Sequence, residues 1–162
     1  MGGRAEEQET DRWHRAKDAV HPLVGVDEIQ VVGALSDSVA IQLGIPTHVR
    51  TVLIHPDVVR HILTQRGGGL HDAEFVLKYM ADAVSRPHYC GRDPRQPNRF
   101  DLVFRVEAEE RILFVAIKVV LASAAATSMD ELWVSTGYPL GADFLERKRW
   151  RQTLQPTIPV NP

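Results

Sequence analysis

Three segments in the second half of the chain carry the hydrophobic patterns of β-strands. In residues 100–107, FDLVFRVE, every second residue is apolar and the residues between are Asp, Val, Arg and Glu. This alternation has the two-residue period of a strand. Residues 111–120, RILFVAIKVV, are apolar on both faces, as in a central strand. Residues 130–140, DELWVSTGYPL, are the third segment. The short connection AEER joins the first two as a hairpin, so the pattern predicts an antiparallel meander.

Helical periodicity dominates the part of the chain before this meander. In residues 55–69, HPDVVRHILTQRGGG, Pro and Asp suit a helix start and the glycines end it. Residues 71–87, HDAEFVLKYMADAVSRP, repeat apolar side chains at helical spacing and end at a proline. Residues 28–35 and 48–55 have the β-branched content of short strands, with a helical turn or two predicted over 36–44.

Helices followed by a strand meander predict an α+β fold. We expect N-terminal helices packed on one face of an antiparallel four-stranded sheet, which leaves the other face available for exposure. The polar, charged residues 1–27 are expected to be a flexible tail, residues 28–152 to form the domain, and residues 153–162 to be a proline-containing C-terminal tail.

Composition and charge limit the compartment and the partners that we expect for this domain. The 162 residues suit one domain, and the formal net charge of -2 gives no global basic field for nucleic acid. The single cysteine, Cys90, cannot form an internal disulfide, which favours a reducing, cytoplasmic compartment. No apolar run approaches the roughly 20 residues of a membrane-spanning helix. The charged N-terminus lacks a secretory signal pattern, so no membrane partner is expected.

Several polar side chains fall on the predicted open face. Lys118 interrupts an apolar strand, and because an unpaired buried ammonium is costly, it must reach solvent, a carboxylate or a ligand. Arg105 lies opposite an all-apolar strand face and is either a plain solvent-facing cation or a ligand contact. Thr136 and Tyr138 share one face of the last strand, while Ser135 takes the other. An ordinary polar strand edge would explain these three as well.

The loop over residues 86–99 and the helix predicted over residues 55–69 add further candidate site residues. His61 falls beside Val58 on the border of the apolar helix stripe, where it is either a surface residue or part of a site. Tyr89 could stack on a base. Arginine is enriched locally although the chain is slightly acidic, which suits phosphate contacts or a merely solvated loop. The five arginines are Arg86, Arg92, Arg95, Arg99 and Arg105.

The order of these motifs resembles the phage-encoded nuclease-like domains of the BECR fold, a group that takes in barnase, EndoU, the colicin-type tRNases and the RelE toxins. The resemblance covers about residues 29–140. It is carried by RHIL after VLIHPDVV, by AVSRP, and then by FRVE, FVAIKVV and WVSTGYPL. It implies that His61, Lys118 and Thr136 are catalytic, with Tyr138 beside Thr136. Many relatives have a second histidine where this chain reads TQRGGG, which leaves a non-catalytic member as an alternative.

This resemblance implies metal-independent RNA cleavage by attack of a 2′-hydroxyl on the adjacent phosphate. Histidine suits the proton transfers and lysine the developing negative charge. We expect no cofactor and no metal, because His55 and His61 are six residues apart and do not share a helix face as a zinc pair would. The expected partners are RNA, with tRNA one candidate, and an antitoxin or immunity protein. The other hypotheses are an RNA- or protein-binding domain without turnover and a purely structural domain.

Overall fold

The computed structural model describes residues 27–46, 48–64, 69–120, 130–146 and 153–157. Of the predicted tails over residues 1–27 and 153–162, residues 1–26 and 158–162 therefore lie outside the described residues. In chain order the elements are β1 (Gln30–Ala34), α2 (Asp37–Leu43), β2 (Thr51–Ile54), α3 (Pro56–Thr64), α4 (Gly69–Ser85), β3 (Tyr89–Gly91), β4 (Arg99–Val106), η1 (Glu107–Glu109), β5 (Arg111–Val120), β6 (Glu131–Gly141), η2 (Ala142–Glu146) and β7 (Gln155–Pro156).

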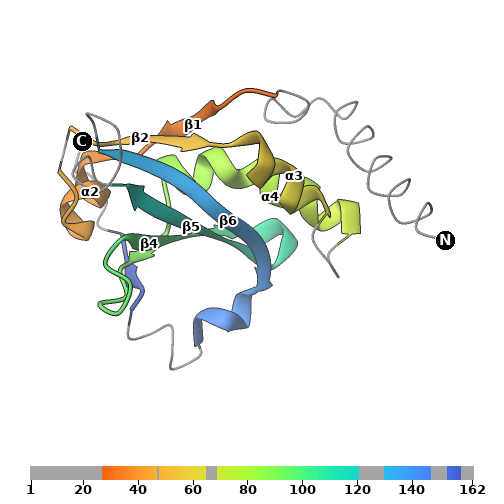
Figure 1. Ribbon diagram of the computed structural model, residues 1–162. Coiled ribbons are helices and arrows are strands. Elements are labelled where there is room, and N and C mark those ends of the chain that lie inside the picture. The colour runs from red at the N-terminus through yellow and green to blue at the C-terminus, as the bar shows by residue number, and fades with distance from the viewer. Residues whose placement is uncertain (1–26, 47, 65–68, 121–129, 147–152, 158–162) are drawn as a thin grey trace.

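The strands form one mixed sheet of seven strands in the order β1-β2-β6-β5-β4-β3-β7 (Figure 1). The predicted α+β class is confirmed, but the predicted antiparallel four-stranded sheet is wrong. The predicted meander is present as β4, β5 and β6. However, β2 pairs with β6 in the parallel direction, and β3 and β7 extend the other edge. Local periodicity reports that a segment is a strand but not which distant strand it pairs with, or in which direction.

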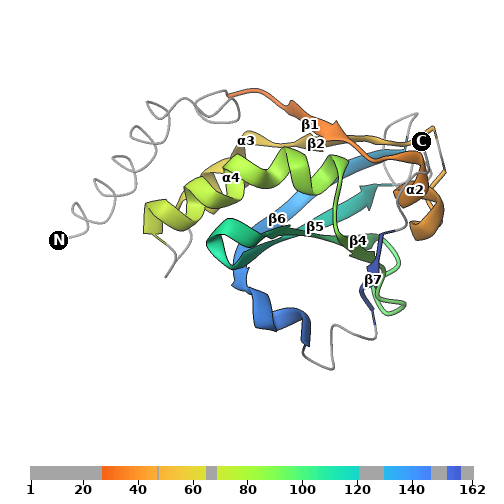
Figure 2. The ribbon, with the colours of Figure 1, turned by 180° about the vertical axis from the view of Figure 1, so that it is seen from behind.

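Helices α3 and α4 lie on one side of the sheet, which we call the helical face (Figures 1 and 2). The main core lies between them, where inward residues of β5 such as Leu113, Val115 and Ile117 join the buried stripe of α4. Gly137 of β6 allows this close packing, since a Cβ there would lie 3.1 Å from a Val76 methyl and 3.2 Å from the Met80 methyl. A larger side chain would push α4 away from β6.

The opposite face of the sheet, which we call the second face, is divided into two halves. In its covered half, a smaller apolar cluster forms around Ile112 and Phe114 of β5, and partly buried Phe144 and Leu145 of η2 pack against it. Tyr138 of β6 stacks on Phe114, with ring centroids 5.0 Å apart. The other members are Val103, Ala116 and Leu154, with Tyr89 and Leu140 packed at the edge.

A β-bulge in β6 decides which side chains reach the second face. Ala116 pairs with Thr136, but the next residue, Ile117, pairs with Val134, so Ser135 is an extra residue. Strict alternation would put Thr136 on the same face as Val134, which is buried in the main core. The bulge turns the chain so that Val134 stays in the core while Thr136 lies on the second face.

Candidate functional site

The open half of the second face consists of Arg99, Lys118, Trp133 and Thr136, none of which belongs to the apolar cluster. Arg99 of β4 and Trp133 of β6 are the direct cross-strand neighbours of Lys118 in β5. The Lys118 side chain is exposed, and within the described part of the chain it makes no hydrogen bond or ion pair. Of the outcomes predicted for Lys118, the structure shows the one in which the ammonium group reaches solvent.

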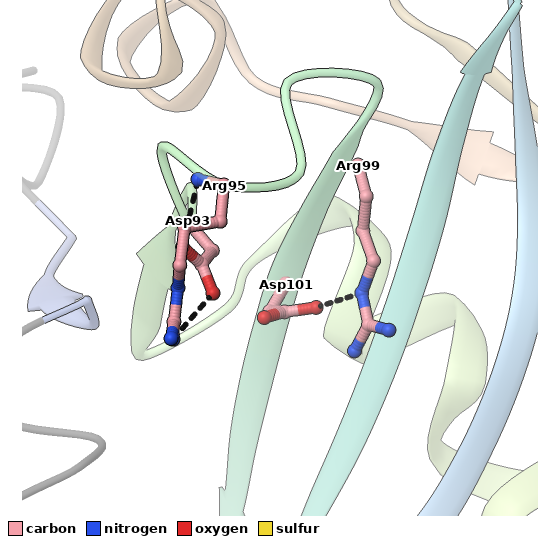
Figure 3. Close-up of polar contacts among 4 residues, drawn as sticks. All are labelled: Asp93, Arg95, Arg99 and Asp101. Carbon is pink, nitrogen blue, oxygen red and sulfur yellow. Dashed lines mark hydrogen bonds and ion pairs between the residues drawn. The ribbon is translucent and has the colours of Figure 1, made fainter.

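Arg99 is held by a carboxylate that lies on the same face. Its Nε donates a hydrogen bond of 3.0 Å to Oδ1 of Asp101, two residues further along β4 (Figure 3). The Asp101 side chain is only 10% exposed, against 38% for Arg99. Burial raises the pKa of Asp101 above its ordinary value, although Arg99 acts in the opposite direction. The cross-strand neighbours of Asp101 are the small residues Gly91 and Ala116.

Thr136 and Lys118 lie on the same sheet face as diagonal neighbours. Thr136 pairs with Ala116, which is two residues before Lys118 in β5. The extra residue Ser135 lies between these two pairings, so the spacing differs from that of a regular diagonal pair. The half-buried Thr136 has no hydrogen bond from its hydroxyl to any described residue, and Ser135 at the bulge is exposed. Tyr138 lies one step further, in the covered half.

Most arginines of the predicted phosphate-binding loop are engaged within the protein. Arg92 donates to the backbone carbonyls of Leu43 and Pro97, at 3.0 and 2.5 Å. Arg95 forms two hydrogen bonds of 3.1 Å with the Asp93 carboxylate (Figure 3). Arg86 pairs with Asp82 in the same way, at 2.9 Å. The local excess of arginine in the sequence is therefore offset in space by nearby carboxylates and carbonyls.

Arg105 belongs to a different group from Lys118. It lies six residues from Arg99 along β4, which is about 20 Å at the usual rise of a strand. Its guanidinium donates to the Tyr89 hydroxyl at 2.9 Å, and its backbone N–H donates to His88 Nδ1 at 2.9 Å. Burial, followed by the charge of Arg105, lowers the pKa of His88. Arg105 and Tyr89 thus lie together at the opposite end of β4 from the open half.

His61 lies on α3, which directly follows β2 and contacts β6. Its side chain is exposed, while Val59, Ile62 and Leu63 form the buried side of the helix. The imidazole makes no hydrogen bond or ion pair with any residue that the structure describes. The structure therefore brings Lys118, Thr136 and Arg99 to the second face, whereas α3, which carries His61, packs on the helical face.

A shallow depression lies away from this group, beside the start of β1. Its volume is about 500 Å³, and its lining includes Asp27, His55, Asp57 and Arg60. These polar groups already interact, since Arg60 pairs with Asp27 at 3.8 Å and His55 with Asp57 at 3.5 Å. None of the predicted site residues lines it. Within the described ranges, no cluster of three or more His, Cys, Asp or Glu residues could hold a metal ion.

Comparison of the chain with protein-family models, with curated proteins and with solved structures finds no match. No helix among the described residues is both long and apolar enough to cross a membrane.

Asp101 and Trp133 were missed as candidates from the sequence. Asp101 entered only as a polar position of the strand over residues 100–107, and Trp133 only as part of a strand motif. The signal available for Asp101 was its place two residues from Arg99 in a strand, because side chains at that spacing share a face. No sequence signal showed that Trp133 would lie beside Lys118, because this depends on the bulge at Ser135.

Proposed function

We propose that the open half binds RNA and cleaves it without a metal ion. The observation that carries this proposal is the exposed Lys118 ammonium, which pairs with no residue that the structure describes and lies beside Arg99 on the same face as Thr136. Two cations side by side attract a phosphate and, in the transition state, stabilise the extra charge of the phosphorane. Trp133 adds an aromatic surface next to Lys118 on which a base can stack.

The proposed reaction is an intramolecular transfer at phosphorus. The 2′-oxygen forms a bond to phosphorus, and the bond from phosphorus to the 5′-oxygen breaks. The proton of the 2′-hydroxyl passes to a water molecule, and the leaving 5′-oxygen takes a proton from solvent water. His61, the base that the resemblance implies, is not assigned this role, because its helix α3 packs on the helical face and Thr136 lies on the second face. The Thr136 hydroxyl orients the phosphate.

A specific observation favours RNA binding without cleavage as the second candidate. Helix α3, which carries His61, packs on the helical face, whereas Lys118 and Thr136 lie on the second face. If no base reaches the phosphate, the two cations and Trp133 would still form a binding surface. The expected cytoplasmic setting, inferred from the single cysteine, suits either candidate. Cys90 is buried, and burial raises its pKa to about 11, so its thiol is poorly reactive.

The test is a cleavage assay with end-labelled RNA in excess EDTA, with analysis of the product ends. We expect the wild type to produce 2′,3′-cyclic phosphate ends and to leave DNA of the same sequence intact. Lys118→Ala should lower the single-turnover rate about 10²–10³-fold, because one donor to the phosphorane is lost. Binding of the RNA should weaken much less, because the phosphorane charge develops only in the transition state.

Lys78→Ala is the matched control, because Lys78 is an exposed lysine on α4, at the helical face. It removes the same charge without changing the open half, so the rate should stay at the wild-type value. Loss of wild-type activity in EDTA, cleavage of the DNA strand, or equal effects of the two lysine variants would contradict the proposal. RNA binding without any cleavage would establish the second candidate instead.

A further inference from the structure

The burial of Asp101 on the second face requires an explanation. Among the described residues it is the one buried charged side chain. Removing a carboxylate from water is costly, and a buried ion pair is often no more stabilising than apolar residues of the same size. An apolar side chain could occupy the position of Asp101, as Val103 does on the same face two residues later in β4. Stability alone therefore gives a poor reason for an aspartate here.

The geometry of the ion pair indicates another role. Asp101 accepts a hydrogen bond from Nε of Arg99, whereas the terminal nitrogens Nη1 and Nη2 have no hydrogen bond to any described residue. Figure 3 shows the guanidinium approaching the carboxylate through this one nitrogen. At Gly91, the cross-strand neighbour of Asp101, a Cβ would overlap the carbonyl oxygen of Thr153, so this glycine lets the backbone of residues 153–154 lie close to the sheet. Lys118 is the direct cross-strand neighbour of Arg99.

We propose that Asp101 is a positioning residue, which holds Arg99 by Nε so that its terminal nitrogens and the Lys118 ammonium are presented together to one RNA phosphate. This assignment rests on the proposed function, because the phosphate is that of the bound RNA. A guanidinium fixed through Nε keeps both Nη groups available for a bidentate contact with phosphate oxygens. Without the carboxylate, the side chain of Arg99 would be free to take other rotamers, and the fixed contact would be lost.

The nearby Asp93–Arg95 pair provides a matched control. It also joins an aspartate to an arginine two residues away, and it is drawn beside the first pair in Figure 3. However, Asp93 accepts three hydrogen bonds from Arg95, one of them from the backbone N–H, and the Arg95 side chain is 80% exposed in the loop before β4. Asp93→Asn and Asp101→Asn thus make the same change of charge in two arginine pairs, of which one lies beside Lys118.

The experiment measures the affinity and the single-turnover cleavage rate of a fluorescently labelled single-stranded RNA in EDTA. Asp101→Asn should bind this RNA at least as tightly as the wild type, because a negative charge near the phosphate is removed. Its cleavage rate should nevertheless fall about tenfold, because Arg99 is no longer oriented. Asp93→Asn should leave the cleavage rate unchanged. A role limited to charge balance would instead raise both affinity and rate, and a damaged fold would lower both.

A double-mutant cycle with Arg99→Lys tests whether Asp101 acts through Arg99. Lysine keeps the charge but lacks the guanidinium fork, so Asp101→Asn should have little further effect on the rate in this background. An equal fold-loss in both backgrounds, or an unchanged rate in Asp101→Asn alone, would overturn the inference.

Side-chain NMR of the arginines separates this inference from the proposed function. Inorganic phosphate should shift the Arg99 guanidinium signals in the wild type, and much less in Asp101→Asn. Arg99 signals that do not respond to phosphate in the wild type would overturn the positioning role, whether or not the protein cleaves RNA. If Arg99 responds and RNA remains intact, cleavage fails while the positioning of Arg99 stands.

Discussion

The two halves of the second sheet face are built on the same strands but have different surroundings. In the covered half, Phe114 of β5 and Tyr138 of β6 stack beneath η2. In the open half, the same two strands carry Lys118 and Trp133, and the Lys118 side chain is exposed. Four residues along β5 separate an apolar interior from a solvent-exposed cationic surface.

The difference shows how side-chain chemistry decides which part of a sheet is covered. An apolar face gains free energy when η2 removes it from water, at roughly 25 cal/mol per Å². When a face with two cations is covered, the cations lose their hydration, and each then needs a hydrogen-bond or ion-pair partner within the protein. Asp101 partners one cation, Arg99, and no described residue partners the other, Lys118. The open half therefore keeps a net positive charge that a bound anion can balance.

The largest effect should come from deletion of Ser135, the bulge at which the two halves meet. Without this residue, either Leu132 and Val134 or Thr136 and Tyr138 must change faces. Exposing Leu132 and Val134, both now buried, would cost about 3–6 kcal/mol, at about 1.5–3 kcal/mol for each side chain. Urea unfolding measures this loss.

Ser135→Ala is the control for the deletion, because it keeps the number of residues and removes only an exposed hydroxyl. Its free energy of unfolding should stay within about 0.5 kcal/mol of the wild type. If the deletion is no more harmful than this substitution, the two halves of the face do not depend on the bulge.

A slightly smaller effect is expected from Phe114→Ala in the covered half. Phe114 is fully buried, so its truncation should lower the free energy of unfolding by about 3–5 kcal/mol. Lys118→Ala, four residues along the same strand, should change it by no more than about 0.5 kcal/mol. Both values come from urea denaturation curves. Similar losses in the two variants would show that the open half is packed like the covered half.

The smallest effect is a pH dependence at the boundary between the two halves. Because burial raises the folded-state pKa of Asp101, its contribution to stability is fully present below its ordinary value of 3.8 and is lost as the pH rises towards the folded-state pKa. Asp101→Asn does not titrate. The stability of the wild type relative to this variant should therefore decrease as the pH rises through this window.

Urea midpoints of the two proteins, measured from pH 3.5 to neutral pH, check this slope. If the wild type instead becomes more stable relative to Asp101→Asn as the pH rises, Arg99 outweighs burial and lowers the pKa of Asp101. In that case, the ion pair would be a stabilising contact and would not need a functional explanation.

The sequence by itself determined the identity of the main elements, because each depends on a local pattern. Alternation and apolar content placed the β4–β5–β6 meander, and helical spacing placed α3 and α4. A lysine within an apolar strand also limited Lys118 to solvent, a carboxylate or a ligand, since burial without a partner is too costly. These predictions required no knowledge of distant contacts.

Tertiary structure decided the pairings that no local pattern records. The parallel pairing of β2 with β6 and the addition of β7 to β3 join segments that are far apart in the sequence. The arginine loop, which looked cationic in the sequence, is largely neutralised in space. The bulge at Ser135 moved Trp133 next to Lys118, and Gly91, opposite Asp101, lets the backbone of residues 153–154 lie close to the sheet. Each of these features depends on which strands pair with one another. The free energy of strand pairing is a sum over the whole sheet and is not set by any single segment.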